Sequence, residues 1–442
     1  MFRTHAPRAL GEMQDYVVTY EYAGEHGKLF TAPATVAMRY SDLCEARTEM
    51  SFASFDCDFA SPVTLRIKPT YPASTVDVRP HRRDVDYTFD GEELVITMAE
   101  PMKLSVEFDG DMYHNLFLFG GTPMEAPVGD KVRFFGPGGH HVGEIVLSDG
   151  ETLYLDGDAV VFGRVVAKGN NITITGRGIL TGVEYNHDYD FPRHQLCRVV
   201  DANHVKIEGI TMLDAPAWTL ATYDTKDLEI LDVRQICHNG NSDGLDICGC
   251  EDVLIDDCFL RNWDDNISLK AFGKLDNRNI VCRNTVMWTD RAHNMLVGPE
   301  SRGGDHVFED ILFENIDVLE HRELSPDFMG VMAIFCADNA ILRNITWRGI
   351  HIERMTYGQV FDFRYVTLFA ESIGRETTDI TMEDISLEAP IVHRSRILGL
   401  DEKHMMRNIT IRNFTQFGRP LTADDPTVEI NEFTENIVFT EE

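Results

Sequence analysis

The chain has 442 residues, more than one ordinary hydrophobic core holds, and its composition (43% hydrophobic, 26% charged) is that of a folded globular protein. Its 73 Asp and Glu against 40 Lys and Arg give a formal net charge of −33. Such a field repels nucleic acid and anionic membranes, so we expect neither as a partner, and a polyanionic substrate is disfavoured unless a local basic patch overrides it.

The first residues show no apolar segment of a secretory signal, and no stretch approaches the ~18 apolar residues that a membrane span needs. The nine cysteines are scattered, which favours reduced, buried side chains over a disulfide framework. Cys248 and Cys250 have no second pair at zinc-like spacing. These features favour a cytoplasmic protein and leave a homo-oligomer open.

Residues 1–118 show the period of half-buried strands. Apolar and polar residues alternate over 63–67 and 102–108, and Asp-Gly turns stand at 90–91 and 109–110. Helical periodicity is nearly absent. We therefore predict a small antiparallel β-sandwich domain over residues 1–118.

Residues 119–442 carry a repeat of short β-type runs, each followed by a small or polar corner and a second apolar run. Intervals between the first five starts are 33, 23, 25 and 27 residues. A self-similar β unit at this irregular period predicts a solenoid, with the length variation in the loops of one side. The starts are Asn171, His204, Asp227, Asp252, Asn279, His306, Ala340, Asp379 and Asn408.

A group of carboxylates recurs at the spacing of one coil. Asp243, within Asn241-Ser242-Asp243-Gly244, precedes Asp264-Asp265 by 21 residues. Because neighbouring coils lie only ~4.8 Å apart, these carboxylates can meet. Adjacent Asp residues point to opposite faces of a regular strand, so the backbone at 264–265 must turn if both face one cleft. Like-charge repulsion should then keep one carboxyl group protonated, as glycoside hydrolysis requires.

The Asp-Asp pair means little by itself, because the chain is acidic and the pair also occurs at 256–257 and 424–425. His293 follows Asp265 by 28 residues, again about one coil. A histidine alone is more often structural than catalytic. The four residues together predict a ladder of catalytic groups on consecutive coils.

At these residues the sequence resembles glycoside hydrolase family 28, the polygalacturonase-type enzymes, over most of 120–440. The family pattern N-T-D-G, D-D and G-H-G stands here as Asn241-Ser242-Asp243-Gly244, Asp264-Asp265 and Ala292-His293-Asn294. The N-terminal sandwich is similar to that of the dextranase and isopullulanase enzymes. The resemblance implies a right-handed parallel β-helix, hydrolysis with inversion, and no metal or other cofactor.

By motif position, the resemblance implies that Asp264 is the general acid, that Asp243 and Asp265 hold the nucleophilic water, and that His293 supports Asp264. We expect the acid and base carboxyls at the ~6.5–9.5 Å separation of inverting enzymes.

The departures from the family pattern bear on the substrate. Polygalacturonases carry an R-I-K that engages the sugar carboxylate, whereas this chain has Met332 and Ile334 near those positions. Burying a carboxylate without a cation is costly, so a neutral sugar is favoured. A cation from elsewhere is the alternative: Arg291, Arg302, Arg322 or Lys270.

The expected function is exo-type trimming of a short, neutral or non-standard oligosaccharide. The alternatives are a polygalacturonase or exo-galacturonidase acting on pectin fragments, a β-helix polysaccharide lyase or epimerase, and a non-catalytic carbohydrate-binding solenoid. Trp218 and Trp263 could stack on sugar rings, although core packing is the default for Trp in a coil. Candidate substrate contacts are Asn241, His238, Lys270, Asn294, Glu300, His321 and Arg322.

Overall fold

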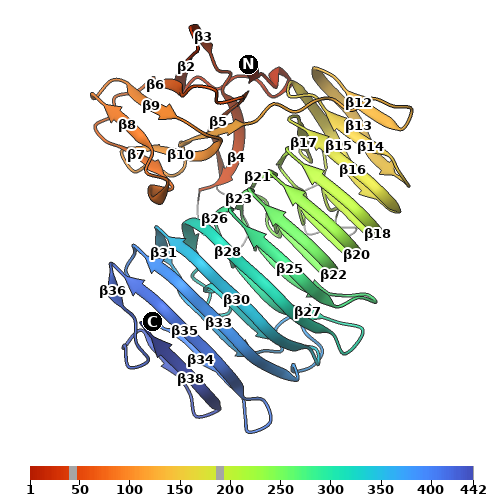
Figure 1. Cartoon of the computed structure of the whole chain (residues 1–442), viewed down its shortest axis with the longest axis vertical. Helices are drawn as coiled ribbons and strands as arrows, with labels where there is room; N and C mark the ends of the chain where they lie inside the picture. Colours follow the sequence, from red (N-terminus) through yellow and green to blue (C-terminus); the bar gives the residue numbers. More distant parts are fainter. Residues whose placement is uncertain (39–46, 186–193, 442) are drawn as a thin grey trace.

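The computed structural model describes residues 1–38, 47–185 and 194–441. Their regular structure is almost entirely β-strand (Figure 1). The two helical segments among these residues are short 3₁₀ turns, η1 (Arg8–Leu10) and η2 (His81–Arg83). No helix of the described part is long and apolar enough to cross a membrane. The predicted all-β class is confirmed.

The N-terminal strands form two sheets that share one core (Figure 1, red to orange). One sheet has the order β1-β5-β11-β10-β7 with β4 beside β5, and the other β3-β2-β6-β9-β8. Pairing is antiparallel except between β5 and β11. The strands are β1 (Phe2–His5), β2 (Tyr16–Tyr22), β3 (Glu25–Lys28), β4 (Ala32–Ala37), β5 (Arg47–Cys57), β6 (Val63–Pro69), β7 (Val76–Arg79), β8 (Asp86–Phe89), β9 (Leu94–Met98), β10 (Met102–Phe108) and β11 (Leu116–Gly121).

The first of these sheets is buried on both faces, because its outer face packs on the flank of the second unit. Phe117 and Phe119 contact Phe259 there, with ring centroids 4.6 and 5.1 Å apart. Arg79, almost fully buried, donates to Glu107 at 2.9 Å and to Glu353 of the second unit at 2.7 Å. The sandwich is therefore joined to the rest of the chain by both apolar and ionic contacts.

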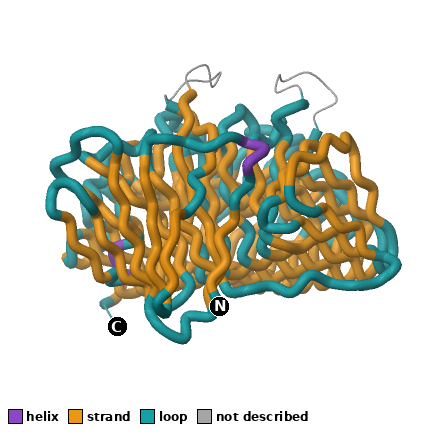
Figure 2. Tube along the Cα trace, turned by 90° about the horizontal axis from the view of Figure 1, so that it is seen from above, coloured by secondary structure: helices purple, strands orange, loops and turns teal. Residues whose placement is uncertain are grey.

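The remaining strands wind into a right-handed parallel β-helix, whose coils stack from yellow to blue in Figure 1 and are seen from above in Figure 2. All pairs in this sheet are parallel except β35–β36. Its first half comprises β12 (Val132–Phe135), β13 (Gly138–Leu147), β14 (Thr152–Leu155), β15 (Ala159–Ala167), β16 (Asn170–Gly176), β17 (Ile179–Thr181), β18 (Cys197–Glu208), β19 (Thr211–Leu213), β20 (Leu220–Leu231), β21 (Arg234–Cys237), β22 (Leu245–Asp256), β23 (Phe259–Asn262), β24 (Ile267–Ala271) and β25 (Asn277–Arg283).

Its second half comprises β26 (Val286–Thr289), β27 (Met295–Ser301), β28 (Val307–Arg322), β29 (Gly330–Cys336), β30 (Ile341–Ile352), β31 (Met355–Tyr357), β32 (Gln359–Tyr365), β33 (Glu376–Leu387), β34 (Ser395–Leu398), β35 (Met406–Gln416), β36 (Arg419–Pro420), β37 (Val428–Ile430) and β38 (Thr434–Thr440). The last strand of the sandwich ends at Gly121 and the first strand of the β-helix begins at Val132. The predicted boundary at 118/119 therefore falls inside β11.

Each coil turns at a residue in the left-handed region, which explains the Asn and Asp residues at the repeat starts. Their φ values lie between 51° and 59°. Two predicted starts are wrong by four residues: the coil positions are Asp310 and Asn344, not His306 and Ala340. The set comprises Asn171, His204, Asp227, Asp252, Asn279, Asp310, Asn344, Asp379, Asn408 and Asn436.

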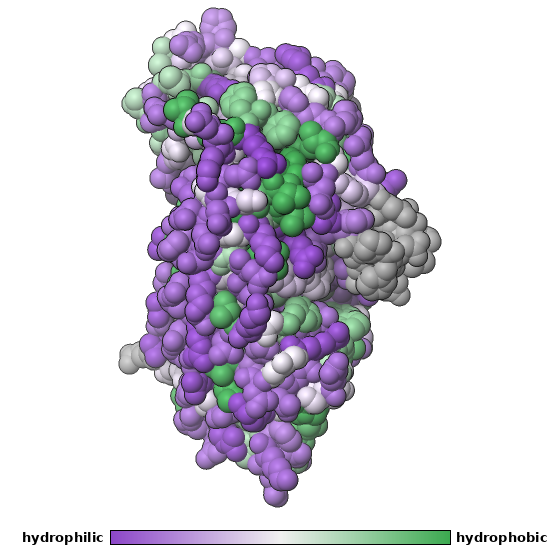
Figure 3. Space-filling model, turned by 90° about the vertical axis from the view of Figure 1, so that its right-hand side faces the viewer, coloured by the Kyte–Doolittle hydropathy of each residue, from purple (hydrophilic) through white to green (hydrophobic). Residues whose placement is uncertain are grey.

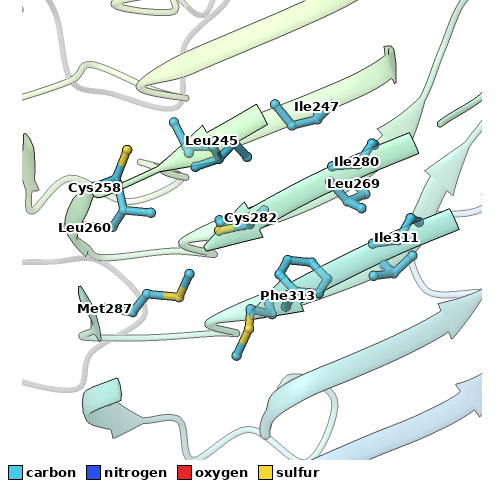
Figure 4. Packing of buried hydrophobic residues seen from close by; sticks show 14 of the residues in the cluster. Leu245, Ile247, Cys258, Leu260, Leu269, Ile280, Cys282, Met287, Ile311 and Phe313 are labelled. Atoms are coloured by element: carbon cyan, nitrogen blue, oxygen red, sulfur yellow. The ribbon is translucent and has the colours of Figure 1, made fainter. Parts of the chain in front are cut away.

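Inside the helix, apolar side chains stack coil over coil. Ile280 aligns with Ile311 and Cys282 with Phe313 (Figure 4). The cysteines of the described residues are free and buried, as predicted, whereas Cys44 lies outside them. The face of the molecule seen in Figure 3 is mostly hydrophilic, with hydrophobic patches between the polar side chains. The core thus fixes the coil register on which the site depends.

Candidate active site

Coil register brings the predicted catalytic residues together. The backbone N–H of Gly244 donates to the carbonyl oxygen of Asp265 at 2.7 Å, and that of Asn266 donates to the carbonyl oxygen of His293 at 2.9 Å. Asp243, Asp265 and His293 therefore occupy equivalent places on three successive coils. Asp243 is thus level with Asp265, 22 residues further on (265 − 243 = 22), rather than with Asp264, and the catalytic roles expected of these residues stay a prediction.

Gly244 permits this stacking. A Cβ atom at Gly244 would lie 2.5 Å from the carbonyl oxygen of Asn266 and 2.5 Å from the side-chain nitrogen of Asn262. The glycine of the Asn-x-Asp-Gly motif is thus needed because the next coil, which carries Asp264 and Asp265, passes directly against it.

The three carboxylates converge at this point. Asp264 and Asp265 lie in the bend between β23 and β24, so both avoid the alternation of a strand. One oxygen from each of Asp243, Asp264 and Asp265 lies within 4.8 Å of the others. The nearest oxygens are therefore closer than the ~6.5–9.5 Å expected of inverting enzymes, and a separation this short favours retention unless the carboxylates hold a water molecule between them.

The surroundings divide the carboxylates into different protonation states. Burial, followed by the charges of Asp243 and Asp265, raises the pKa of Asp264 well above its usual value. Burial also raises the pKa of Asp243, to about 6, against the opposing effect of Lys270. For Asp265, burial is outweighed by the charge and hydrogen bonds of His293, and the pKa is lowered. One acid and one ionised carboxylate thus lie side by side at neutral pH.

His293 holds Asp265 rather than Asp264. Its backbone N–H lies 2.9 Å and its Nδ1 2.7 Å from the same Asp265 oxygen. The ring is buried, with Phe335 edge-on at a centroid distance of 5.1 Å. His293 therefore contacts Asp265 directly, whereas the resemblance implied a role for it beside Asp264.

Lys270 forms the second anchor of the cluster. Its Nζ lies 3.0 Å from Asp243, 2.8 Å from Asp246 and 3.3 Å from Glu300, and 3.9 Å from the ring centroid of Trp218. Although burial opposes its charge, these carboxylates hold the pKa of Lys270 well above its usual value. Burial and then the charge of Asp243 raise the pKa of Asp246 well above its usual value. The ammonium is therefore a fixed internal counter-ion.

The carboxylates open into a cavity of about 520 Å³, within the roughly 300–1,000 Å³ of small-ligand sites. Asn241, Lys270 and Glu300 line it, as predicted for substrate contacts, and Trp218 and Trp263 line it too, although core positions were expected. Its other lining residues are Arg291, Ala292, Leu296, Pro299, Phe328, Phe335, Leu368 and Phe369.

Four predicted contacts lie outside this lining, because their side chains are buried in protein contacts. Asn294 pairs with Asn266 and with His321, whose Nε2 lies 2.7 Å from the Met329 carbonyl oxygen. Burial lowers the pKa of His321 to about 3. His238 lies 3.3 Å from Asp214, and Arg322 lies 3.4 Å from Asp290.

Asp246 and the phenylalanines of the cavity, Phe328, Phe335 and Phe369, were not predicted. Asp246 alternates with Leu245 and Ile247, which point into the core, so strand period could have placed it on the cleft face. Phe328 and Phe369 come from loops that carry no such signal.

The register of β29 shows that Met332 and Ile334 are not the residues to compare with the Arg and Lys of the polygalacturonase R-I-K. Met332 and Ile334 point into the core. The alternate residues, Ala333 and Phe335, belong to the apolar cluster beside the cavity, and Phe335 lines it. The cavity-side positions of this strand are therefore apolar, which leaves the argument against a bound carboxylate intact.

Within the β-helix, a carboxyl group that retains its proton thus lies beside an ionised one, an arrangement suited to general acid–base catalysis. The family model described as glycosyl hydrolases family 28 matches residues 180–395, which include all of these groups. Over these residues the chain is similar to that family.

The curated relatives match part of the chain. Rhamnogalacturonase A of Aspergillus aculeatus is 24% identical over 285 residues, covering 55% of this chain and 62% of the relative. Exopolygalacturonase B of Aspergillus niger is 24% identical over 240 residues, covering 52% of each. The chain thus spans between half and two thirds of the length of these relatives.

Two solved structures share the fold. Dex49A from Penicillium minioluteum has a TM-score of 0.60 at 14% identity and covers 99% of this chain and 100% of its own. The family 28 exopolygalacturonase of Yersinia enterocolitica has a TM-score of 0.51 at 13% identity, covering 86% and 94%. Such identities establish the architecture alone.

Proposed function

We propose that this glycoside hydrolase removes a neutral sugar from the end of a short oligosaccharide, with inversion. The observation that carries the proposal is the division of labour among three adjoining carboxylates: Asp264 retains a proton, whereas Asp265 is held ionised by His293.

In this mechanism Asp264 donates its proton to the leaving oxygen. Asp243 and Asp265 orient the attacking water and take up its proton. A water molecule forming ~2.8 Å hydrogen bonds can bridge oxygens up to about 5.6 Å apart, so the 4.8 Å limit on the nearest oxygens allows one water between Asp243 and Asp265. Asp243 is held by Lys270 and Asp265 by His293. These contacts favour a role for both carboxylates in holding the water molecule rather than in attacking the sugar directly.

The preference for a neutral sugar rests on the cations of the cavity. Lys270 already contacts three carboxylates. Arg291 donates to the buried Glu323 at 3.3 Å and stacks on Trp263, with its guanidinium carbon 5.0 Å from the ring centroid. A sugar carboxylate would have to compete with these internal anions for either cation, at a desolvation cost of its own.

Exo action is supported by the size of the cavity and by a pair of rings at its edge. About 520 Å³ suits a short oligosaccharide, and Phe328 stacks on Phe369 with centroids 6.0 Å apart and planes at 17°. A cytoplasmic location remains part of the proposal, to be tested by fractionating cells and detecting the protein in each fraction.

A galacturonide substrate is the second candidate, favoured by the similarity to a rhamnogalacturonase and an exopolygalacturonase. A metal-dependent lyase is a third, because three carboxylates within 4.8 Å can hold Ca²⁺. The ammonium of Lys270, 3.0 Å from Asp243, competes with such an ion for that carboxylate. Activity that survives a chelator, with no unsaturated ultraviolet-absorbing product, would exclude the lyase.

The test is to incubate the protein with a panel of neutral and galacturonate-containing oligosaccharides and to follow the first-formed anomer by proton NMR. We expect release of a terminal neutral sugar with inverted configuration, lost in Asp264→Asn. Retained configuration would contradict the mechanism, internal cleavage would contradict exo action, and preferred cleavage of a galacturonide would contradict the substrate class.

A further inference from the structure

One side of the cavity is an apolar wall made of Leu296, Phe328, Phe335, Leu368 and Phe369. It begins one coil beyond the carboxylates, because Leu296 on β27 aligns with Ser268 on β24, the strand of Lys270. Neighbouring coils are ~4.8 Å apart, so a sugar held at Asp264 lies within a substituent's reach of this wall.

The wall is held in place although part of it is exposed. Arg396 donates to the carbonyl oxygen of Pro326 at 2.7 Å, and Arg364 to that of Asp327 at 3.3 Å, on the loop that carries Phe328. Arg302 donates to the carbonyl oxygen of Phe369, whose side chain is 58% exposed. Fixed, exposed aromatic rings at the edge of a polar site are typical of surfaces that a ligand covers.

The chemistry of the wall selects what covers it. Among the described residues, the cations near the wall are already engaged: Lys270 and Arg291 with carboxylates, and Arg302 with the carbonyl oxygen of Phe369 and, at 3.9 Å, with Glu300. A sugar carboxylate would have to displace one of these contacts. A hydroxymethyl group would give up hydrogen bonds to water against side chains that cannot replace them. A methyl group loses no hydrogen bond and buries apolar surface on both sides.

We propose that the apolar wall binds a methyl-terminated substituent of the sugar that is cleaved, either the methyl group of a 6-deoxy sugar or that of a methyl ester. The proposal rests on the proposed function, because it takes the cavity to be the site of a glycoside.

The test uses disaccharides that differ only at C6 of the non-reducing sugar: methyl, hydroxymethyl, carboxylate and methyl carboxylate, each in several ring configurations. We expect kcat/KM for a methyl-bearing compound to exceed that of its hydroxymethyl counterpart by about 10- to 200-fold, the range for one such group in an apolar pocket. Preference between the 6-deoxy sugar and the ester identifies the source of the methyl group.

Variants locate the preference. Phe369→Ser should reduce it at least several-fold. Phe417→Ser is the matched control, because Phe417 is 61% exposed, also has a positive φ, and lies away from this cavity in the turn after β35. An unchanged preference in Phe369→Ser, or hydroxymethyl compounds cleaved as well as methyl ones, would overturn the proposal.

Failure here is distinguishable from failure of the proposed function. If hydrolysis depends on Asp264 but its rate does not vary with the C6 substituent, the proposed role of the apolar wall is refuted and the proposed function stands. If no compound is cleaved, saturation-transfer NMR with the corresponding monosaccharides still tests the wall. The strongest signal should fall on the C6 methyl protons and weaken in Phe369→Ser, and uniform signals or none would refute it.

Discussion

Replacing Lys270 by Met removes the positive charge that Asp243, Asp246 and Glu300 share while keeping the length of the side chain. Its Nζ lies 3.0 Å from Asp243, which the proposed mechanism uses in its ionised form. Without the ammonium, burial and the charge of Asp265 act on Asp243 with less opposition. The pKa of Asp243 should therefore rise from about 6.

The size of the effect follows from the contact. An opposite charge within ~4–6 Å lowers the pKa of a carboxyl group by about 1 to 3 pH units, so its removal should raise it by that amount. At a pH near the present value of about 6, the ionised fraction of Asp243 would fall from about one half to between ~10% and ~0.1%. The expected loss of kcat/KM at that pH is thus about 5- to 500-fold. Because the base works when ionised, activity should recover as pH rises, until Asp264 loses its proton.

The assay is kcat/KM across the pH range, with the acid limb as the readout. Lys270→Arg, which keeps the charge, should move the acid limb much less than Lys270→Met. Lys274→Met is the surface control, because Lys274 is 79% exposed and pairs with Asp201. Thermal unfolding checks that each variant is folded. A Lys270→Met profile that is uniformly lower, with its acid limb unmoved, would show that Lys270 does not set the ionisation of the base.

Three further changes test the site and its support. His293→Ala removes the ring donor 2.7 Å from Asp265, so the pKa of that carboxyl should rise, kcat fall about 10- to 100-fold and the acid limb of the pH profile move upward; a uniform loss would refute it. Gly244→Ala places a Cβ 2.5 Å from the carbonyl oxygen of the next coil, so calorimetry should show a loss of about 1–3 kcal/mol, with reduced activity, whereas a neutral result would mean that the coils separate freely. Arg79→Ala removes the guanidinium that joins the buried Glu107 and Glu353, of which Glu107 keeps Arg354, and should cost about 3 kcal/mol by denaturant unfolding. The more exposed Arg66→Ala should cost less than about 1 kcal/mol, and equal losses would contradict the buried anchor.

The architecture was predictable because it repeats. Every coil needs a left-handed turn residue followed by apolar residues, so the local sequence is enough to identify coil starts such as Asn279-Ile and Asn408-Ile. The starts at Asp310 and Asn344 were missed by four residues because the stretch before each also reads as a β run. The predicted ladder of Asp243, Asp264, Asp265 and His293 followed from coil spacing alone.

The surroundings of the ladder were less predictable. Lys270 was expected to contact substrate, but only the fold brings Asp243, Asp246 and Glu300 around its ammonium. His321 was also expected in the cleft, yet it is buried in its contact with the loop that follows β28. A single sequence gives the spacing of residues along coils, whereas partners across loops depend on how those loops cross the cleft.

The substrate argument is where this distinction matters most. Spacing placed Met332 and Ile334 near the cations of the polygalacturonase pattern, but strand period turns both into the core, so their identity says nothing about a ligand. The informative residue is Phe335, which lines the cavity one position further along β29. A lysine at this position would supply the cation that a sugar carboxylate needs. Phe335→Lys should therefore improve cleavage of a galacturonide relative to its neutral counterpart, whereas the wild-type chain should prefer the neutral compound. A wild-type preference for the galacturonide would mean that the ion pairs of Lys270 or Arg291 open on binding, and the case for a neutral sugar would fall.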